Sequence, residues 1–169
     1  MRPRILWGLL VFGHLGVNPG IADAQEAPNV KTQGLLADAI ATALRHIVGQ
    51  RDGWVVVVGE NFPEPDAARA AATSVGLRFA LKHEDVVRCS DDRKDCRIVG
   101  SERRVITLYG LARPRGDLVL NVILRVITSP QVESPDGTAR LFPTLREITL
   151  SLANGVVWTV TGDQVILRS

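Results

Sequence analysis

The residues best suited to bind a small molecule lie in and around the stretch Leu118–Thr128. Both alternating sets of positions in this stretch are mainly hydrophobic, which predicts a central strand covered on both faces. Asn121 and Arg125 interrupt one set, and a covered guanidinium needs a carboxylate or several other acceptors. Glu147 is its natural partner, and Tyr109 can line the same cavity. We predict that these four form the polar end of an apolar ligand pocket; alternatively, Arg125 reaches the rim or makes a structural ion pair.

Basic residues gather in the middle of the chain. Residues 88–115 contain eight basic and four acidic side chains, a net charge of +4. If they share a face, their guanidinium groups can bind an anionic surface or a carboxylate-bearing protein through forked hydrogen bonds. The alternative is that the 17 arginines of the chain, against 3 lysines, reflect coding composition and not selection for guanidinium groups. The candidate partner-binding residues are Arg93, Lys94, Arg103, Arg104 and Arg113.

The chain has two cysteines, Cys89 and Cys96. Such close spacing in an exported protein predicts a disulfide that closes a short charged loop. This loop either presents a preorganised surface to a partner or forms a soluble hairpin tip. We predict no metal site, because two cysteines do not complete a tetrahedral zinc site and the loop lacks the spacing of a calcium cage.

An export signal is predicted for residues 1–24. Arg2 and Arg4 precede a 13-residue apolar run, and Ala22-Asp23-Ala24 is a small-x-small cleavage site. The run is shorter than the roughly 20 residues of a membrane span, so we expect cleavage after Ala24 and no transmembrane segment thereafter. We therefore predict a periplasmic or secreted protein.

The remaining 169 − 24 = 145 residues carry 18 basic and 17 acidic side chains, a net charge of +1. This near balance makes nucleic acid an improbable partner. We expect residues 25–32 to form a mobile segment and residues 33–169 to form a single α+β domain. A dimer through an exposed sheet face is left open by the sequence.

Catalytic motifs are missing from the sequence. It contains no Gly-x-Ser-x-Gly elbow, His-Glu-x-x-His zinc motif or phosphate-binding glycine loop. His46 and His83 are the histidines that remain after cleavage, and helix-end or surface roles are the common ones for such residues, although His83 can serve as a general acid or base. The sequence therefore leaves enzymatic activity uncertain, disfavours it, and predicts no cofactor.

Two N-terminal helices are predicted around one buried strand. Gln33–Val48 has a helical stripe, with Thr32 as a candidate N-cap, and Trp54–Val58 is apolar throughout, as expected of a strand covered on both faces. A second helix starts at Pro65. The first stripe contains Leu36, Ile40, Ala43, Leu44 and Ile47, and the second contains Ala68, Ala71, Ala72, Val75 and Phe79.

From Glu84 onward the hydrophobic period changes to 2, which predicts antiparallel strands. We expect an α+β fold in which the two helices pack on one face of a curved, mostly antiparallel sheet of about five to six strands. The predicted strands after the second helix are Val86–Arg88, Arg97–Val99, Arg103–Leu111, Leu118–Thr128, Leu141–Leu152 and Gly155–Leu167.

Three functional hypotheses follow. The first is an exported, noncatalytic binding or accessory module of the cell envelope that contacts a small apolar ligand or a protein partner. The alternative is a small cone-fold enzyme that performs acid-base chemistry in a pocket between sheet and helices, with Glu147, Tyr109 or His83. The third is a secreted interaction factor that acts through the arginine-rich, disulfide-tipped hairpin.

Overall fold

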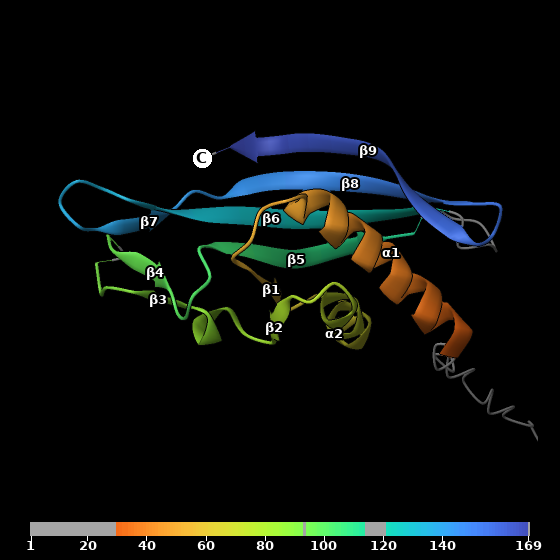
Figure 1. Cartoon of the computed structure of the whole chain (residues 1–169), viewed down its shortest axis with the longest axis horizontal. Helices are drawn as coiled ribbons and strands as arrows, with labels where there is room; N and C mark the ends of the chain where they lie inside the picture. The colour runs from red at the N-terminus through yellow and green to blue at the C-terminus, as the bar shows by residue number, and fades with distance from the viewer. Residues whose placement is uncertain (1–29, 93, 114–120, 169) are drawn as a thin grey trace, which may run out of the picture.

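The computed structural model describes residues 30–92, 94–113 and 121–168. The predicted signal peptide, Arg93 and the first three residues of the predicted strand Leu118–Thr128 lie outside these ranges. Within them the chain forms an α+β fold with two helices, a seven-stranded sheet and a small two-stranded sheet (Figure 1). None of the described helices is long and apolar enough to cross a membrane.

The large sheet is mixed, although most of its strand pairs are antiparallel. Its order is β2-β1-β5-β6-β8-β9, and β7 pairs with β6. β1 runs parallel to both β2 and β5, whereas the later strands pair antiparallel. The strands are β1 Trp54–Val58, β2 Arg78–Ala80, β5 Arg104–Ala112, β6 Asn121–Glu133, β7 Ala139–Leu141, β8 Thr144–Ala153 and β9 Val157–Arg168. The mostly antiparallel sheet is therefore confirmed, and its predicted curvature stays a prediction.

Helix α1, Val30–Val48, buries the predicted stripe. Leu36, Ile40, Ala43, Leu44 and Ile47 are all buried. The helix begins three residues before the predicted start at Gln33, so Thr32 lies within it and does not cap it. The spacing of apolar residues predicts which face of a helix is buried, but it does not fix the residue at which the helix begins.

Helix α2, Pro65–Ser74, connects the parallel strands β1 and β2, which need a crossover between them. The sequence prediction was wrong in extending this helix to Phe79, which lies in β2. Gly76 has a φ of 71°, a left-handed conformation that ends the helix. Phe79 follows Val75 by four residues, so a hydrophobic residue at this position fits a helical stripe as well as it fits a strand.

Both helices cover one face of the sheet. Their buried side chains form a continuous core with β1, β5, β6 and β8, as predicted for helices packed on one face. Among the described residues, the cover of the other face lies over β1 and the adjoining parts of β5 and β6, and it consists of a short 3-10 helix, η1 His83–Asp85, and a hairpin of β3 Val87–Cys89 and β4 Cys96–Ile98. The sheet residues of this second core are Val55, Val57 and Val105.

Helix α1 is linked to the far strands by a small polar cluster. His46 Nε2 lies 2.8 Å from Asp163 Oδ2, and Arg146 donates from Nε and Nη2 to the same carboxylate. Burial alone would raise the pKa of the Asp163 carboxyl, but the hydrogen bonds from Arg146 and His46 hold that pKa below its usual value of 3.8. The charged form of Asp163 is therefore stabilised in the folded chain.

Replacing Asp163 with asparagine removes this charge and preserves the size of the side chain. We expect Asp163→Asn to lower the free energy of unfolding at neutral pH by about 1 kcal/mol, as for other partly exposed ion pairs. Because the pKa is lower in the folded chain, the contribution is present above the unfolded-state pKa and is lost as the pH falls through the folded-state pKa. Urea denaturation at several pH values measures it.

The control for this experiment is Asp38→Asn, which alters an exposed carboxylate of α1, the helix that Asp163 contacts through His46. It should change the free energy of unfolding little at any pH. If the difference between Asp163→Asn and the wild type stays constant down to about pH 2, the assigned role of the ionised carboxylate is wrong.

Candidate functional site

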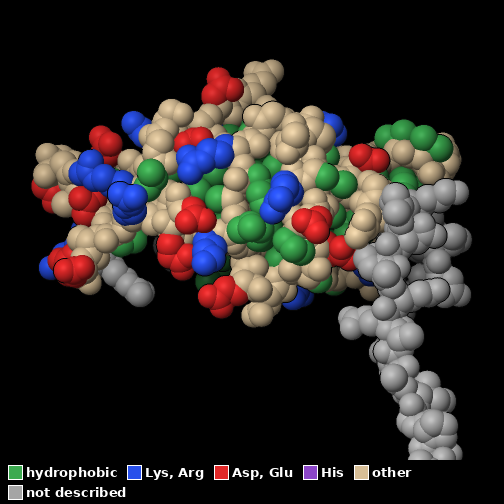
Figure 2. Space-filling model, turned by 90° about the horizontal axis from the view of Figure 1, so that it is seen from below, with side chains coloured by type: hydrophobic (Ala, Val, Ile, Leu, Met, Phe, Trp, Pro, Cys, Tyr) green, Lys and Arg blue, Asp and Glu red, His purple; other side chains and the backbone are tan. Residues whose placement is uncertain are grey.

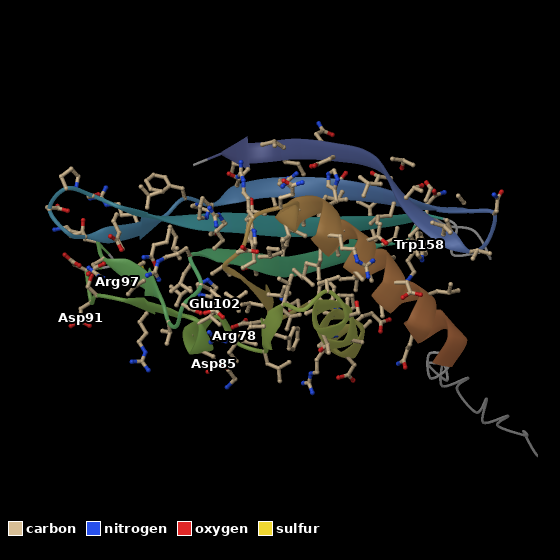
Figure 3. The ribbon with its side chains drawn as sticks, in the orientation of Figure 1. Arg78, Asp85, Asp91, Arg97, Glu102 and Trp158 are labelled. Carbon is tan, nitrogen blue, oxygen red and sulfur yellow. A yellow bond between two sulfur atoms is a disulfide. The ribbon has the colours of Figure 1, made fainter. Side chains whose placement is uncertain are left out.

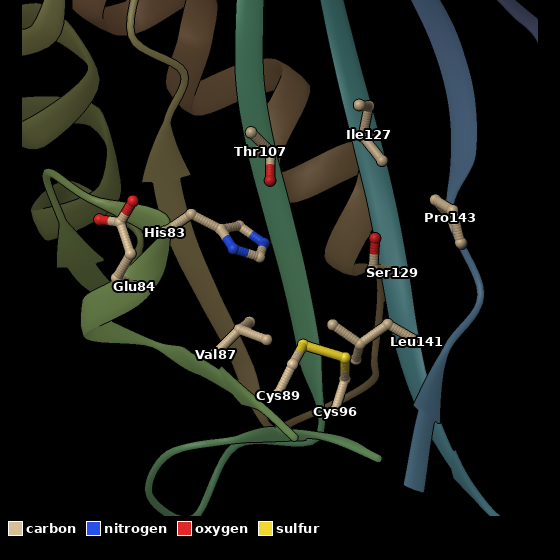
Figure 4. Close-up of a pocket in the computed structure, with 10 residues that line it drawn as sticks. All are labelled: His83, Glu84, Val87, Cys89, Cys96, Thr107, Ile127, Ser129, Leu141 and Pro143. Atoms are coloured by element: carbon tan, nitrogen blue, oxygen red, sulfur yellow. A yellow bond between two sulfur atoms is a disulfide. The ribbon is translucent and has the colours of Figure 1, made fainter. Parts of the chain in front are cut away.

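A cleft of about 670 Å³ lies between the β3–β4 hairpin and the face of the sheet that the helices leave open (Figure 4). Strands β5 and β6 form its floor, and η1, the hairpin and the segment between β7 and β8 form its walls. Most of the lining is apolar. The lining residues are His83, Glu84, Val87, Cys89, Cys96, Thr107, Ile127, Ser129, Leu141 and Pro143.

The hairpin is fastened to β6 and β7 by polar contacts from β4 and from the loop that precedes it. Ile98 N donates to Gln131 Oε1 at 2.8 Å, and Ala139 N donates to Asp95 Oδ1 at 2.9 Å. Arg97 donates to the same carboxylate and to the carbonyl oxygen of Gly137. The backbone N–H of Ala139, followed by Arg97, lowers the pKa of Asp95, so the carboxylate stays charged at neutral pH.

The segments that flank the hairpin are held by Arg78 of β2. Its Nη1 donates to Glu102 Oε2 at 3.0 Å and to the carbonyl oxygen of Val99 at 2.9 Å. Its Nη2 reaches the carbonyl oxygen of Asp85 at 3.5 Å, so one guanidinium joins η1 to the segment after β4 (Figure 3). Both ends of the cleft wall are therefore fixed to the large sheet.

Three polar side chains reach the cleft from different elements. The imidazole of His83 points into it from η1, and the hydroxyl groups of Thr107 and Ser129 face it from β5 and β6 (Figure 4). Among the described residues, none of these three groups has a side-chain hydrogen bond. The Glu84 carboxylate points away from the imidazole. The cleft thus combines apolar walls with donors and acceptors that remain available to a ligand.

A smaller hollow of about 300 Å³ adjoins the cleft and shares His83, Glu84 and Thr107 with it. Gly59, Glu60 and Lys82 are among its other lining residues. This hollow is more polar than the main cleft, so the side of the cleft next to His83 is the polar side. A ligand with one polar end would place that end here.

The disulfide between Cys89 and Cys96 is present, as predicted, with sulfur atoms 1.99 Å apart. The two residues lie opposite each other in the β3–β4 register, and both line the cleft. The disulfide therefore forms part of the cleft wall in addition to closing the charged loop. None of the described His, Cys, Asp and Glu residues form a group of three or more that would hold a metal ion.

The residues predicted to bind a ligand lie on the open face of the sheet, outside the cleft. Arg125 Nε donates to Glu147 Oε2 at 2.9 Å, which is the pairing expected from the sequence. The arginine side chain is 52% exposed, however, so the expected covered environment is absent. Tyr109 lies at the irregularity in β5, and Asn121 accepts a hydrogen bond from Ser151. A ligand-binding role for these four residues stays a prediction.

Arg125 lies across a glycine of the neighbouring strand. A Cβ atom at Gly110 would be 3.3 Å from the Arg125 Cβ and 3.4 Å from its Cδ. The side chain of Arg125 therefore lies along the sheet and reaches Glu147 on the next strand. The hydrophobic residues beside it in β6, Ile123 and Ile127, are only half-buried. The presence of these isoleucines suggested a covered face, but in the structure both are accommodated half-buried.

The described residues that were predicted to bind a protein partner belong to several separate elements. Lys94 lies 3.3 Å from Asp92 in the disulfide loop, and Arg113 pairs with Glu64 at 2.9 Å. Arg103 is exposed, and Arg104 at the start of β5 lies on the side of the helices. Figure 2 shows Lys and Arg interspersed with Asp and Glu over the visible surface. Arg93 lies outside the described residues, and the partner-binding role stays a prediction.

Comparison with known proteins provides no functional information: the chain matches no protein-family model, no curated protein and no solved structure. The function must therefore be argued from the geometry of the cleft.

Removing the disulfide should destabilise the protein. We expect Cys89→Ala combined with Cys96→Ala to lower the free energy of unfolding by about 2 to 3 kcal/mol, because an unfolded chain without this short loop has more conformational freedom. Chemical denaturation measures the change, and the wild type in reducing agent should match the double variant. Equal stability of the oxidised, reduced and substituted proteins would contradict this role.

Proposed function

We propose that the protein is an exported binding module that takes a small, mainly apolar ligand in the cleft between the β3–β4 hairpin and the open face of the sheet. The observation that carries this proposal is the lining of the cleft, in which Val87, Ile127, Leu141 and Pro143 surround a few polar groups. Small-molecule sites typically combine apolar walls with a small number of polar groups that orient the ligand.

The size and polarity of the cleft define the class of ligand. Its volume of about 670 Å³ falls within the range of small-molecule sites. His83, Thr107 and Ser129 all face the cleft and can form hydrogen bonds with a ligand. The disulfide and the leucine and isoleucine side chains of the lining provide apolar surface. The ligand is therefore a compact hydrophobic molecule with one hydroxyl, carbonyl or amide end.

The surroundings of His83 favour binding over catalysis. A histidine that activates a nucleophile is normally hydrogen-bonded to that nucleophile and oriented by a third group. Within the described ranges, the imidazole of His83 has no such carboxylate or hydroxyl partner, and Glu84 points away from it (Figure 4). The helix–sheet interface, where the cone-fold hypothesis places its pocket, is largely filled by buried hydrophobic side chains, and the Glu147, Tyr109 and His83 of that hypothesis lie on the other face of the sheet.

Export is supported by two independent features. Residues 1–24 have the charge, apolar run and cleavage site of a signal peptide. The disulfide between Cys89 and Cys96 is of the kind that persists in oxidising compartments. Together they favour a periplasmic or secreted location.

Binding of an apolar fluorescent probe tests the proposed site. We expect N-phenyl-1-naphthylamine to bind saturably, and Ile127→Ser to weaken that binding about tenfold, because the serine removes hydrophobic contact area from the cleft. Ile123→Ser is a matched control, since Ile123 occupies the same face of β6 but does not line the cleft. A fluorescence titration measures both affinities.

Two results would overturn the proposed function. One is equal probe affinity in the wild type, Ile127→Ser and Ile123→Ser. The other is turnover in a broad hydrolase and isomerase screen that His83→Ala abolishes, which would show the site to be catalytic.

Expression of the full chain in a bacterium, followed by fractionation, tests the proposed export. We expect the protein to accumulate outside the cytoplasm with Gln25 as its first residue, because signal peptidase cleaves after a small-x-small sequence. Mass spectrometry identifies the terminus. Ala24→Pro should block processing, whereas a cytoplasmic protein that retains Met1 would rule out a cleaved signal.

A further inference from the structure

A second cleft, of about 440 Å³, lies on the opposite side of the sheet, next to the C-terminal end of α1. Three arginines from separate parts of the chain line it: Arg51 follows α1, Arg104 begins β5, and Arg146 belongs to β8. None of its lining residues is acidic. The other residues of the lining are Ile47, Trp54, Thr128, Pro130, Thr144 and Val165.

The three guanidinium groups differ in how their charges are balanced. Arg146 pairs with Asp163, which neutralises it. Arg104 donates to the carbonyl oxygen of Asp52 at 2.8 Å and forms no ion pair with a described carboxylate. Arg51 is exposed, and no described carboxylate pairs with it either. The cleft therefore holds two positive charges with uncommitted donors, since a guanidinium has five N–H groups.

Such a concentration of positive charge favours an anion in the cleft. Arginine recognises planar oxyanions through two parallel N–H···O bonds, and these bonds strengthen where water is partly excluded. Thr128 and Thr144 are half-buried or buried in the same wall. The Thr128 hydroxyl donates to the carbonyl oxygen of Thr144 at 3.5 Å, so the Thr144 hydroxyl is the one that can add a hydrogen bond to an oxyanion held by the arginines.

The rest of the lining is suited to a flat hydrophobic group. The guanidinium of Arg104 lies over the Trp54 ring, 5.8 Å from its centre. Trp54 is 8% exposed, and its indole N–H has no hydrogen-bond partner among the described residues. Ile47, Pro130 and Val165 provide apolar surface beside it. An anion without a hydrophobic body would leave this surface in contact with water.

We propose that this cleft binds a small organic carboxylate with a planar, apolar body. The carboxylate lies between Arg51 and Arg104, and the body contacts Trp54 and the neighbouring aliphatic side chains. This site is independent of the first cleft, because the two lie on opposite faces of the sheet and share no lining residue.

Isothermal titration calorimetry of the full chain with 2-naphthoate tests the proposal. We expect saturable binding, and about tenfold weaker binding by Arg51→Ala and by Arg104→Ala, because each removes a charge-assisted contact. Arg69→Ala is a matched control: Arg69 also lies over an aromatic ring, that of Phe79 at 5.6 Å, but outside this cleft. Arg69→Ala and Ile127→Ser should bind 2-naphthoate as the wild type does.

Two further titrations define the ligand class. Neutral 2-naphthamide should bind at least about tenfold more weakly than 2-naphthoate, since it lacks the charge. Inorganic phosphate should also bind more weakly, because it lacks the hydrophobic body. Equal or tighter binding of phosphate would overturn the proposed organic carboxylate in favour of a simple oxyanion site.

The proposal fails if 2-naphthoate does not bind at concentrations up to about 10 mM, roughly ten times the dissociation constant of about 1 mM expected for a weak specific contact. It also fails if Arg69→Ala weakens binding as much as the two cleft substitutions do. Arg51 makes no described side-chain bond, so Arg51→Ala should keep the wild-type unfolding midpoint. Weaker 2-naphthoate binding by Arg51→Ala at an unchanged unfolding midpoint then separates a binding defect from a folding defect.

Discussion

The architecture depends on the fact that strand β1 has no polar face. All five residues of Trp54–Val58 are buried, so the sheet needs a cover on both sides at this strand. The two helices provide one cover, and the disulfide hairpin with η1 provides the other. Farther along the sheet, the buried hydrophobic residues of β8 and β9 in the described chain belong to the core on the helical side. The first cleft lies where the second cover ends and the open face begins.

The need to cover β1 on both faces explains why much of the fold could be predicted from the sequence. Five apolar residues in succession indicated a strand covered on both faces, and the buried positions of α1 follow directly from its hydrophobic period. The parallel pairing of β1 with β2 and β5 was not accessible, since it depends on crossovers between distant segments. β2 itself is three residues long, too short for a period of 2 to be distinguished from the end of a helix.

The candidate sites were harder to predict than the fold. The ion pair between Arg125 and Glu147 could be predicted from the sequence, because charge compensation limits the choice of partners. The exposure of this pair could not be predicted, because a sequence shows that one face of a strand is half-apolar without showing what lies over that face. The cleft next to His83 arises from the hairpin being fastened across the sheet by Gln131 and Asp95. Such contacts between distant polar residues leave no periodic signal.

Strand β6 contributes to both clefts through four consecutive residues. Ile127 and Ser129 line the first, whereas Thr128 and Pro130 line the second. Side chains of a strand alternate between faces, so the deletion or insertion of one residue within this stretch would exchange the two linings. Substitutions can therefore adjust either cleft separately, but the length of the segment is constrained by both. During divergence, this part of the chain should accept changes of residue type far more readily than gaps.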